Sequence, residues 1–262
     1  MTMLIQALGL ERPRLISLCG AGGKTTLMFT LAREFVEAGE RVLITTTTKI
    51  AREETHGWPS FSAARAGEAL ACALALLPEN GPARAGAVVG YSRIGGDGYR
   101  LVGFTPECVD ELAATGRFDR ILVEADGSAR KPLKAPAAHE PVIPCATDAL
   151  VIVAGINGLG PPLNEANLFR AEIWSRLSGL APGEPISAES LARCVAHPDG
   201  LARGCPAGAH RALFLNQADT PARRALAKQV VECLAGLPGI QLDRIVTGCL
   251  LPQPDIAVAL SL

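Results

Sequence analysis

The sequence predicts an α/β fold in which a mainly parallel sheet carries helices on both of its faces. Short apolar runs alternate along the chain with segments of helical periodicity, and a glycine-rich turn joins the first run to the first helix. Parallel strands need long crossovers, usually helices, so this alternation indicates parallel pairing. We expect a single domain over residues 1–262, with a small β-hairpin insertion at about residues 84–104.

The order of the elements follows from the positions of the apolar runs. Residues 15–18 predict the first strand, and the four-residue recurrence of Leu27, Leu31 and Phe35 predicts a helix that Gly39 ends. Further strands are expected at residues 41–44, 120–123, 149–153 and 212–215 and near Ile245, and further helices at residues 62–77, 106–114, 165–177, 187–195 and 221–234.

Two segments depart from this alternation. Gly95 to Gly98 lie between the apolar runs around Val88 and Leu101, which predicts the hairpin insertion. Residues 130–144 contain four prolines, which lack an amide hydrogen, so this segment is expected to be a stiff loop.

The composition is that of a globular protein with an aliphatic core. Of the 262 residues, 48% are hydrophobic and 4% are aromatic. The 25 Lys and Arg residues balance 26 Asp and Glu residues, giving a formal charge of −1. Because this leaves no basic excess to bind a phosphate backbone, we expect no nucleic-acid partner.

The location that the sequence predicts is the cytoplasm. The amino terminus lacks the charged start and cleavage site of a secretory signal, and the longest apolar stretch is too short to span a membrane. The eight cysteines never occur as Cys-x-x-Cys, which predicts reduced, mostly buried thiols and no zinc site.

The glycine turn has the spacing of a shortened phosphate loop. Leu18 stands at the first glycine of the full consensus, but the short form Gly-x-x-Gly-Lys-Thr is present. Backbone amides and the helix amino terminus would hold the phosphates of ATP or GTP, and Lys24 would reach the outer phosphates. The expected nucleotide-binding residues are Gly20, Ala21, Gly22, Gly23, Lys24, Thr25 and Thr26. The alternative is a plain glycine turn with a solvated lysine.

Two carboxylates follow the strand at residues 120–123. Glu124 and Asp126 are two positions apart, so on a strand they point to the same side, as in a Walker B element. We expect Thr25, Glu124 and Asp126 to hold Mg²⁺, and Lys24, Glu124 and Asp126 to be catalytic. Asp126 would bind the metal while Glu124 polarises a water or a hydroxyl, or the two roles would be exchanged. The alternative is that the two residues form an ordinary acidic junction between a strand and a loop.

A second polar run follows the strand at residues 212–215. Asn216 to Asp219 is similar to the Asn-Lys-x-Asp element of GTPases, with Gln217 in place of the lysine. Asp219 could accept two hydrogen bonds from the amino-oxo edge that guanine and pterins share. Asn216 and Asp219 are therefore candidate base-reading residues, or else a strand-to-helix turn with an aspartate cap.

Two further polar segments are candidates for a second substrate or a switch. Thr47, Thr48 and Lys49 follow the strand at residues 41–44, where they could contact the terminal phosphate, or the threonines are simply strand formers. Charged residues on the proline-rich loop would bind an anionic second substrate, unless the loop is a solvated surface. These residues are Lys131, Lys134, His139 and Glu140.

The ordered set of motifs resembles a known family. Residues 20–26, 45–50, 123–128 and 131–144 together resemble the YqeC family of selenium-dependent molybdenum hydroxylase accessory proteins, over most of the chain. The resemblance implies a role in making or inserting a selenium-containing molybdenum cofactor, with a molybdopterin-type cofactor and a molybdenum hydroxylase as partners. The shortened phosphate loop alone also resembles that of the Mur ligases and folylpolyglutamate synthases.

We therefore expect a P-loop NTPase-like protein that depends on Mg²⁺ and ATP or GTP. The first hypothesis is an enzyme that hydrolyses the nucleotide or transfers its phosphoryl group during maturation of a molybdenum hydroxylase. The second is a cofactor-carrying chaperone or switch with little turnover, and the third is a Mur-like ligase.

Overall fold

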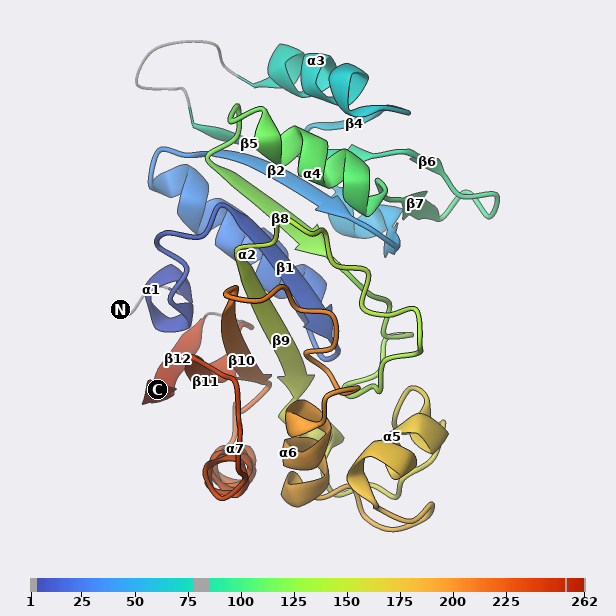
Figure 1. Cartoon of the computed structure of the whole chain (residues 1–262), viewed down its shortest axis with the longest axis vertical. Coiled ribbons are helices and arrows are strands. Elements are labelled where there is room, and N and C mark those ends of the chain that lie inside the picture. The colour runs from blue at the N-terminus through green and yellow to red at the C-terminus, as the bar shows by residue number, and fades with distance from the viewer. Residues whose placement is uncertain (1–3, 78–84, 253, 262) are drawn as a thin grey trace.

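The computed structural model describes residues 4–77, 85–252 and 254–261, and within them nine strands form one twisted sheet (Figure 1). Adjacent strands of this sheet pair in parallel, except that β12 runs antiparallel to β11. In spatial order the strands are β12 (Asp255–Ser261), β11 (Arg244–Cys249), β10 (His210–Asn216), β9 (Ala149–Gly155), β1 (Leu15–Gly20), β8 (Arg120–Glu124), β2 (Arg41–Thr46), β5 (Gly86–Tyr91) and β4 (Ser60–Ser62).

One face of the sheet is covered by α1 (Leu4–Leu8) and α2 (Lys24–Glu37). Leu27, Leu31 and Phe35 are buried against this face, as their four-residue spacing predicts. The Glu34 carboxylate accepts hydrogen bonds from the amides of Leu4 and Ile5, both at 3.1 Å, and so fixes α1 to α2.

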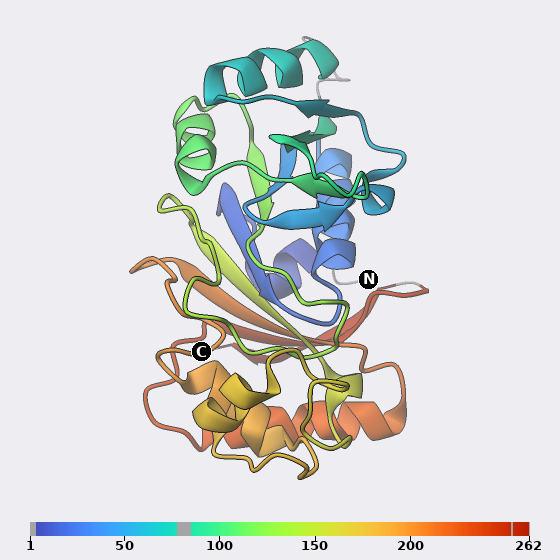
Figure 2. The same ribbon diagram turned by 90° about the vertical axis from the view of Figure 1, so that its right-hand side faces the viewer.

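The opposite face carries two separate groups of helices, at the two ends of the sheet (Figures 1 and 2). The first group packs over β2, β5 and β8, and the second over β9, β10 and β11. The first comprises α3 (Ala66–Leu76) and α4 (Pro106–Ala114), and the second α5 (Ala171–Ser178), α6 (Ala188–Ala196) and α7 (Pro221–Ala235). The predicted α/β class with helices on both faces is confirmed.

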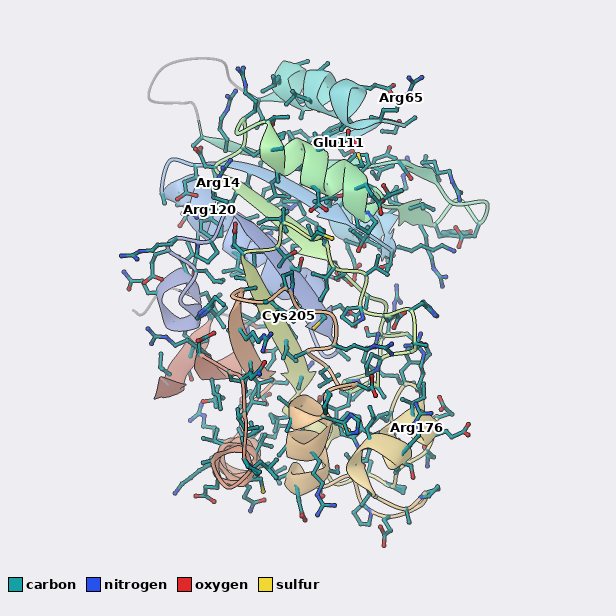
Figure 3. The ribbon with its side chains drawn as sticks, viewed as in Figure 1. Arg14, Arg65, Glu111, Arg120, Arg176 and Cys205 are labelled. Atoms are coloured by element: carbon teal, nitrogen blue, oxygen red, sulfur yellow. The ribbon has the colours of Figure 1, made fainter. Side chains whose placement is uncertain are left out.

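The amino end of the sheet is fixed by a buried arginine. Arg120 donates to the Glu40 carboxylate at 2.5 and 3.0 Å and to the carbonyls of Glu11 and Pro13, near Arg14 (Figure 3). Its guanidinium also stacks over Phe35, 4.8 Å from the ring centre. This end is therefore structural, and the polar candidates lie at the other end of the strands.

The hairpin lies within a smaller sheet of β3 (Lys49–Ala51), β7 (Arg100–Val102) and β6 (Arg93–Ile94). Residues 95–99 join β6 to β7, and these two strands pair antiparallel. Val88 instead belongs to β5 in the main sheet, because its side chain packs into the core with α3 and α4. Residue 84, the predicted start of the insertion, lies outside the described residues. A short 3₁₀ helix, η1 (Arg52–Thr55), follows β3, and a second, η2 (Ile156–Gly158), follows β9.

Two predicted helices begin later than expected. The helix predicted at residues 62–77 begins only at Ala66. Residues 60–62 instead form β4, because Phe61 buries its ring beside Phe104 while its neighbours face outward. The helix predicted at residues 165–177 begins at Ala171, since the backbone of Arg170 is left-handed, with φ 66°. The Glu165 carboxylate accepts from the amides of Arg170 and Ala171, which closes the turn before α5. Among the described residues, no helix is long and apolar enough to cross a membrane.

Candidate functional site

The glycine turn after β1 has a geometry that only glycine permits. Gly20, Gly22 and Gly23 have φ values of 95°, 85° and 122°. A Cβ on Gly20 would lie 2.2 Å from the carbonyl oxygen of Val153, and one on Gly22 would lie 2.4 Å from the amide of Gly155. The loop is therefore pressed against the end of β9 immediately before α2 begins.

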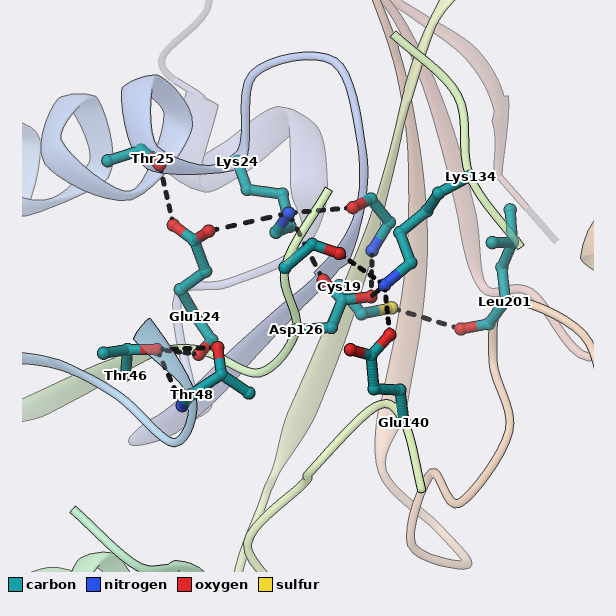
Figure 4. A network of polar contacts seen from close by, with 12 residues as sticks. Cys19, Lys24, Thr25, Thr46, Thr48, Glu124, Asp126, Lys134, Glu140 and Leu201 are labelled. Atoms are coloured by element: carbon teal, nitrogen blue, oxygen red, sulfur yellow. Dashed lines mark hydrogen bonds and ion pairs between the residues drawn. The ribbon is translucent and has the colours of Figure 1, made fainter. Parts of the chain in front are cut away.

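Lys24 begins α2 and turns its amine back into the loop. Its Nζ donates to the Gly20 carbonyl at 2.8 Å and lies 3.5 Å from Glu124 Oε1 and 3.3 Å from Asp126 Oδ1 (Figure 4). Burial would lower the pKa of this amine, but the charges of Asp126 and Glu124 outweigh it and raise the pKa. Lys24 is thus a buried cation held between two carboxylates at the centre of the loop.

Glu124 ends β8 beside the start of α2. Its Oε2 accepts a hydrogen bond from the Thr25 hydroxyl at 2.7 Å. Burial raises the pKa of Glu124, although Lys24 and Thr25 act in the opposite direction. The hydroxyl and the carboxylate, which lie on neighbouring elements, therefore present oxygen atoms to the same point.

Asp126 connects the phosphate loop to the proline-rich loop. Its Oδ2 accepts from the Gly20 amide at 3.0 Å and lies 2.9 Å from Lys134 Nζ. With Lys24 on the other oxygen, the carboxylate lies between two lysines, both almost completely buried. A buried charge in this position requires both partners, because an unpaired ion in the interior is strongly unfavourable.

The network continues through Lys134 to a residue that the sequence did not single out. Lys134 Nζ donates to Glu140 at 2.5 Å, and Arg170 holds the same carboxylate with two nitrogens, at 2.5 and 3.1 Å. Burial tends to raise the pKa of Glu140, but the hydrogen bonds and charges of Arg170 and Lys134 lower it to about 2. Arg170 also stacks on Phe169, 4.4 Å from the ring centre. No motif marks Arg170, since its partners lie far away in sequence.

The threonine run at the end of β2 is hydrogen-bonded to the end of β8. Thr46 Oγ1 donates to the Glu124 carbonyl at 2.7 Å, and the Thr47 hydroxyl donates to the Val142 carbonyl at 2.6 Å. Thr48 donates its amide to Thr46 Oγ1 at 3.0 Å. The run therefore joins β8 to the proline-rich loop.

A cleft of about 1250 Å³ opens in front of Thr25 and Glu124. It extends between the small sheet with η1 on one side and residues 127–130, His139 and Arg170 on the other. Seven of the predicted site residues line it: Thr25, Thr47, Thr48, Lys49, Glu124, His139 and Glu140.

Several other predicted residues lie outside the lining of this cleft. Lys24, Asp126 and Lys134 are buried behind it in the ion network, and Lys131 donates to the Ala166 carbonyl. Asp219 is bound to Arg223 at 2.6 Å on the surface. The roles predicted for these residues stay predictions.

Asn216 lies against the phosphate loop itself. Its Nδ2 donates to the Gly22 carbonyl at 2.8 Å, and a Cβ on Gly23 would lie 2.4 Å from that nitrogen. Asn216 Oδ1 and Gln217 Oε1 are buried and have no hydrogen-bond partner among the residues described. Two unsatisfied amide oxygens thus lie beside the loop, which is uncommon in a protein interior.

The thiol of Cys19 is buried beside the ion network. Cys19 is completely buried and donates to the Leu201 carbonyl at 3.2 Å (Figure 4). Burial raises the pKa of this thiol well above its usual value, and the charge of Asp126 adds to the effect.

The oxygen donors at Thr25 and Glu124 suit Mg²⁺, which prefers hard ligands and usually keeps several waters while it binds one or two protein groups and substrate phosphates. Within the described part of the chain, no group of three or more His, Cys, Asp or Glu side chains is placed to hold a metal by itself. The donors therefore fit a metal that would be shared with a phosphate, and Thr25 and Glu124 would be its protein ligands.

Comparison with known proteins identifies the family. The model of the family described as YqeC protein matches residues 16–172. The chain belongs to the YqeC family. A curated relative from Escherichia coli (strain K12), described as "Uncharacterized protein YqeC", is 34% identical over 247 residues, which are 94% of this chain and 91% of the relative. The resemblance predicted from the ordered motifs is confirmed.

The span that matches the YqeC model contains the phosphate loop, Glu124, Asp126 and Arg170, whereas Asn216 and Asp219 lie beyond it. Among solved structures, the signal recognition particle 54 kDa protein of Aeropyrum pernix K1 in complex with GDP is similar, with a TM-score of 0.39 and 17% identity. That likeness covers 94% of this chain and 44% of the other.

Proposed function

We propose that this protein binds a nucleoside triphosphate with Mg²⁺ at residues 20–26 and hydrolyses it or transfers its terminal phosphoryl group. The observation that carries the proposal is the contact between the first turn of α2 and the end of β8, where Thr25 donates to Glu124 at 2.7 Å and Lys24 lies between Glu124 and Asp126. A glycine loop, a lysine, a hydroxyl and a strand-end carboxylate in this arrangement are the parts that phosphoryl transfer requires.

The proposed role of each residue depends on whether it is buried or lines the cleft. Lys24 is held by carboxylates of fixed position, so the β- and γ-phosphates can replace these partners without a change in its charge. Thr25 and Glu124 open to the cleft and would hold Mg²⁺, which would neutralise charge on the phosphates. Asp126, bound to the Gly20 amide and to both lysines, orients the loop.

The base would lie on the side of Asn216. The two unsatisfied oxygens of Asn216 and Gln217 lie buried beside the loop, so they could accept hydrogen bonds from a base only if the loop moved to expose them. Whether the base is adenine or guanine depends on Asp219, which would have to leave Arg223 to read a guanine edge.

We infer the cellular role from the family resemblance. It is the maturation or insertion of a selenium-containing molybdenum cofactor of a molybdenum hydroxylase, with nucleotide turnover driving the step. The bonds that tie Thr46 and Thr47 to Glu124 and Val142 also favour a second candidate, a nucleotide-dependent carrier or switch with little turnover. A steady-state assay with and without a molybdopterin ligand separates the two, since only the enzyme gives stimulated turnover and a modified product.

The decisive experiment is a calorimetric titration of Mg-ATP and Mg-GTP into the wild type and Lys24→Ala. We expect the variant to lose at least about tenfold in affinity, because a charge-assisted hydrogen bond contributes about 1.5–3 kcal/mol. Lys228→Ala, on the exposed face of α7, is the matched control, and Lys24→Arg tests whether charge alone suffices. Unimpaired binding by a folded Lys24→Ala protein would contradict the proposal.

A further inference from the structure

The cleft in front of Thr25 and Glu124 does not extend along the loop that would hold the nucleotide. Residues 20–23 and Asn216 do not line it, and it runs away from them toward the small sheet and η1. Its volume of about 1250 Å³ also exceeds the roughly 300–1,000 Å³ of common small-molecule pockets. The space beyond the terminal phosphate is therefore large enough for a second substrate.

One wall of this space is a strained turn directly after Asp126. Ala129 and Arg130 both have left-handed backbones, with φ 48° and 58°, although neither is glycine. Lys134 Nζ donates to the Gly127 carbonyl at 2.6 Å, and the Lys131 amide donates to the Ser128 carbonyl at 2.9 Å, so the turn is fixed from within the protein. Strain that neighbouring contacts hold in place is common at ligand-binding sites.

The amides of this turn are free to bind a ligand. In the described part of the chain, the N–H groups of Ser128, Ala129 and Arg130 donate to no protein acceptor, and all three residues line the cleft. Successive amides in a turn form a concave site for an anion.

The opposite wall supplies positive charge. Lys49 and Arg52 line the cleft, and neither side chain has an ion pair within the described residues. The other cations of the cleft are neutralised, because Arg100 faces Asp97, Arg130 faces Glu53 and Arg170 faces Glu140. Of the remaining acids of the cleft, Glu124 lies 3.5 Å from Lys24, and Glu54 lies close enough to Glu124 that burial and then the charge of Glu124 raise the pKa of Glu54.

We propose that the amides of residues 128–130, together with Arg52 and Lys49, bind a phosphate-monoester group of the second substrate. This inference rests on the proposed function, because that function places the terminal phosphate of the nucleotide at the other end of the cleft. The exposed Tyr99 at the rim offers a ring to a flat organic portion of the same substrate.

The test uses phenyl phosphate as the probe, with phenol as its uncharged counterpart, and records ¹⁵N amide shifts of the full chain saturated with a non-hydrolysable Mg-nucleotide. We expect the amides of Ser128, Ala129 and Arg130 to shift with phenyl phosphate and not with phenol. Arg52→Ala should weaken this binding by roughly tenfold and Arg52→Lys should restore part of it. Arg176→Ala, an exposed arginine on α5 away from the cleft, is the matched control.

Several results would overturn the inference: no binding of phenyl phosphate, equal binding of phenol, an unchanged affinity in Arg52→Ala, or shifts confined to residues 20–26. The last would mean that the probe occupies the phosphate loop. The same titration on Lys24→Ala separates the two proposals, since loss of nucleotide binding leaves the phenyl phosphate shifts in place. Conversely, Arg52→Ala should leave the Mg-nucleotide affinity of the wild type intact.

Discussion

At the scale of single residues, the site depends on buried charges that neutralise one another. Asp126 lies between Lys24 and Lys134, and Glu140 lies between Lys134 and Arg170, so three cations alternate with two carboxylates. Each charge is favourable only while its neighbours remain, because desolvation of an unpaired ion costs several kcal/mol. The network therefore holds the phosphate loop, the proline-rich loop and the start of α5 in one arrangement.

The low pKa of Glu140 predicts a loss of stability in acid. The folded-state pKa is lowered from 4.5 to about 2, so the carboxylate stabilises the folded protein above about pH 5, and this contribution fades as the pH falls toward 2. We expect it to be roughly 1–3 kcal/mol. Urea unfolding from neutral pH downward measures it.

In that experiment Glu140→Gln should be less stable than the wild type at neutral pH, and the difference should shrink as the pH falls. Glu189→Gln removes an exposed pair with Arg193 and is the matched control, with an effect below about 1 kcal/mol. A difference between wild type and Glu140→Gln that stays constant with pH would show that the ion pairs do not lower this pKa.

At the scale of elements, the turn between β1 and α2 is fixed by backbone contact with β9. Gly20→Ala places a Cβ 2.2 Å from the Val153 carbonyl on a residue with φ 95°, so the turn must move. We expect a loss of at least about 2 kcal/mol in the free energy of unfolding, measured in urea.

The control for this substitution is Gly116→Ala. Gly116 also has a positive φ, of 65°, but the nearest atom to its added Cβ, Arg14 Nη2, is 4.0 Å away. Gly116→Ala should therefore lose only about 1–2 kcal/mol in the free energy of unfolding, the cost of a left-handed backbone at a residue other than glycine. If the two variants lose equal stability, close packing of the loop against β9 is not what requires glycine at position 20.

At the scale of the whole molecule, ligand binding at the proposed site should stabilise the folded chain. A Mg-nucleotide at about 100 times its dissociation constant adds about 2.7 kcal/mol to the folded state, which raises the melting temperature by roughly 5–10 °C. Thermal unfolding with Mg-ATP, Mg-GTP and either nucleotide in a chelator measures this. An equal shift in the chelator, or in Lys24→Ala, would contradict binding through the metal and the loop.

Much of this architecture could be predicted from the sequence because its signals are local. The helical spacing of Leu27, Leu31 and Phe35, the glycines of the loop and the prolines after Asp126 each constrain the backbone within a few residues. Elements whose position depends on distant partners were missed or misplaced: β4 exists because it pairs with β5, and the start of α5 depends on the Glu165 carboxylate.

The sequence by itself determined the α/β class and the YqeC family, and it predicted the phosphate-loop residues, since periodicity, glycine spacing and motif order are properties of the chain. Only the tertiary structure decided which charges are partners. It placed Lys134 in the interior with Asp126 and Glu140, brought Arg170 to that pair, and left Thr25 and Glu124 at the cleft. The physical reason is that ion pairing and burial depend on distances between strand ends far apart in sequence, which the order of strands in the sheet sets.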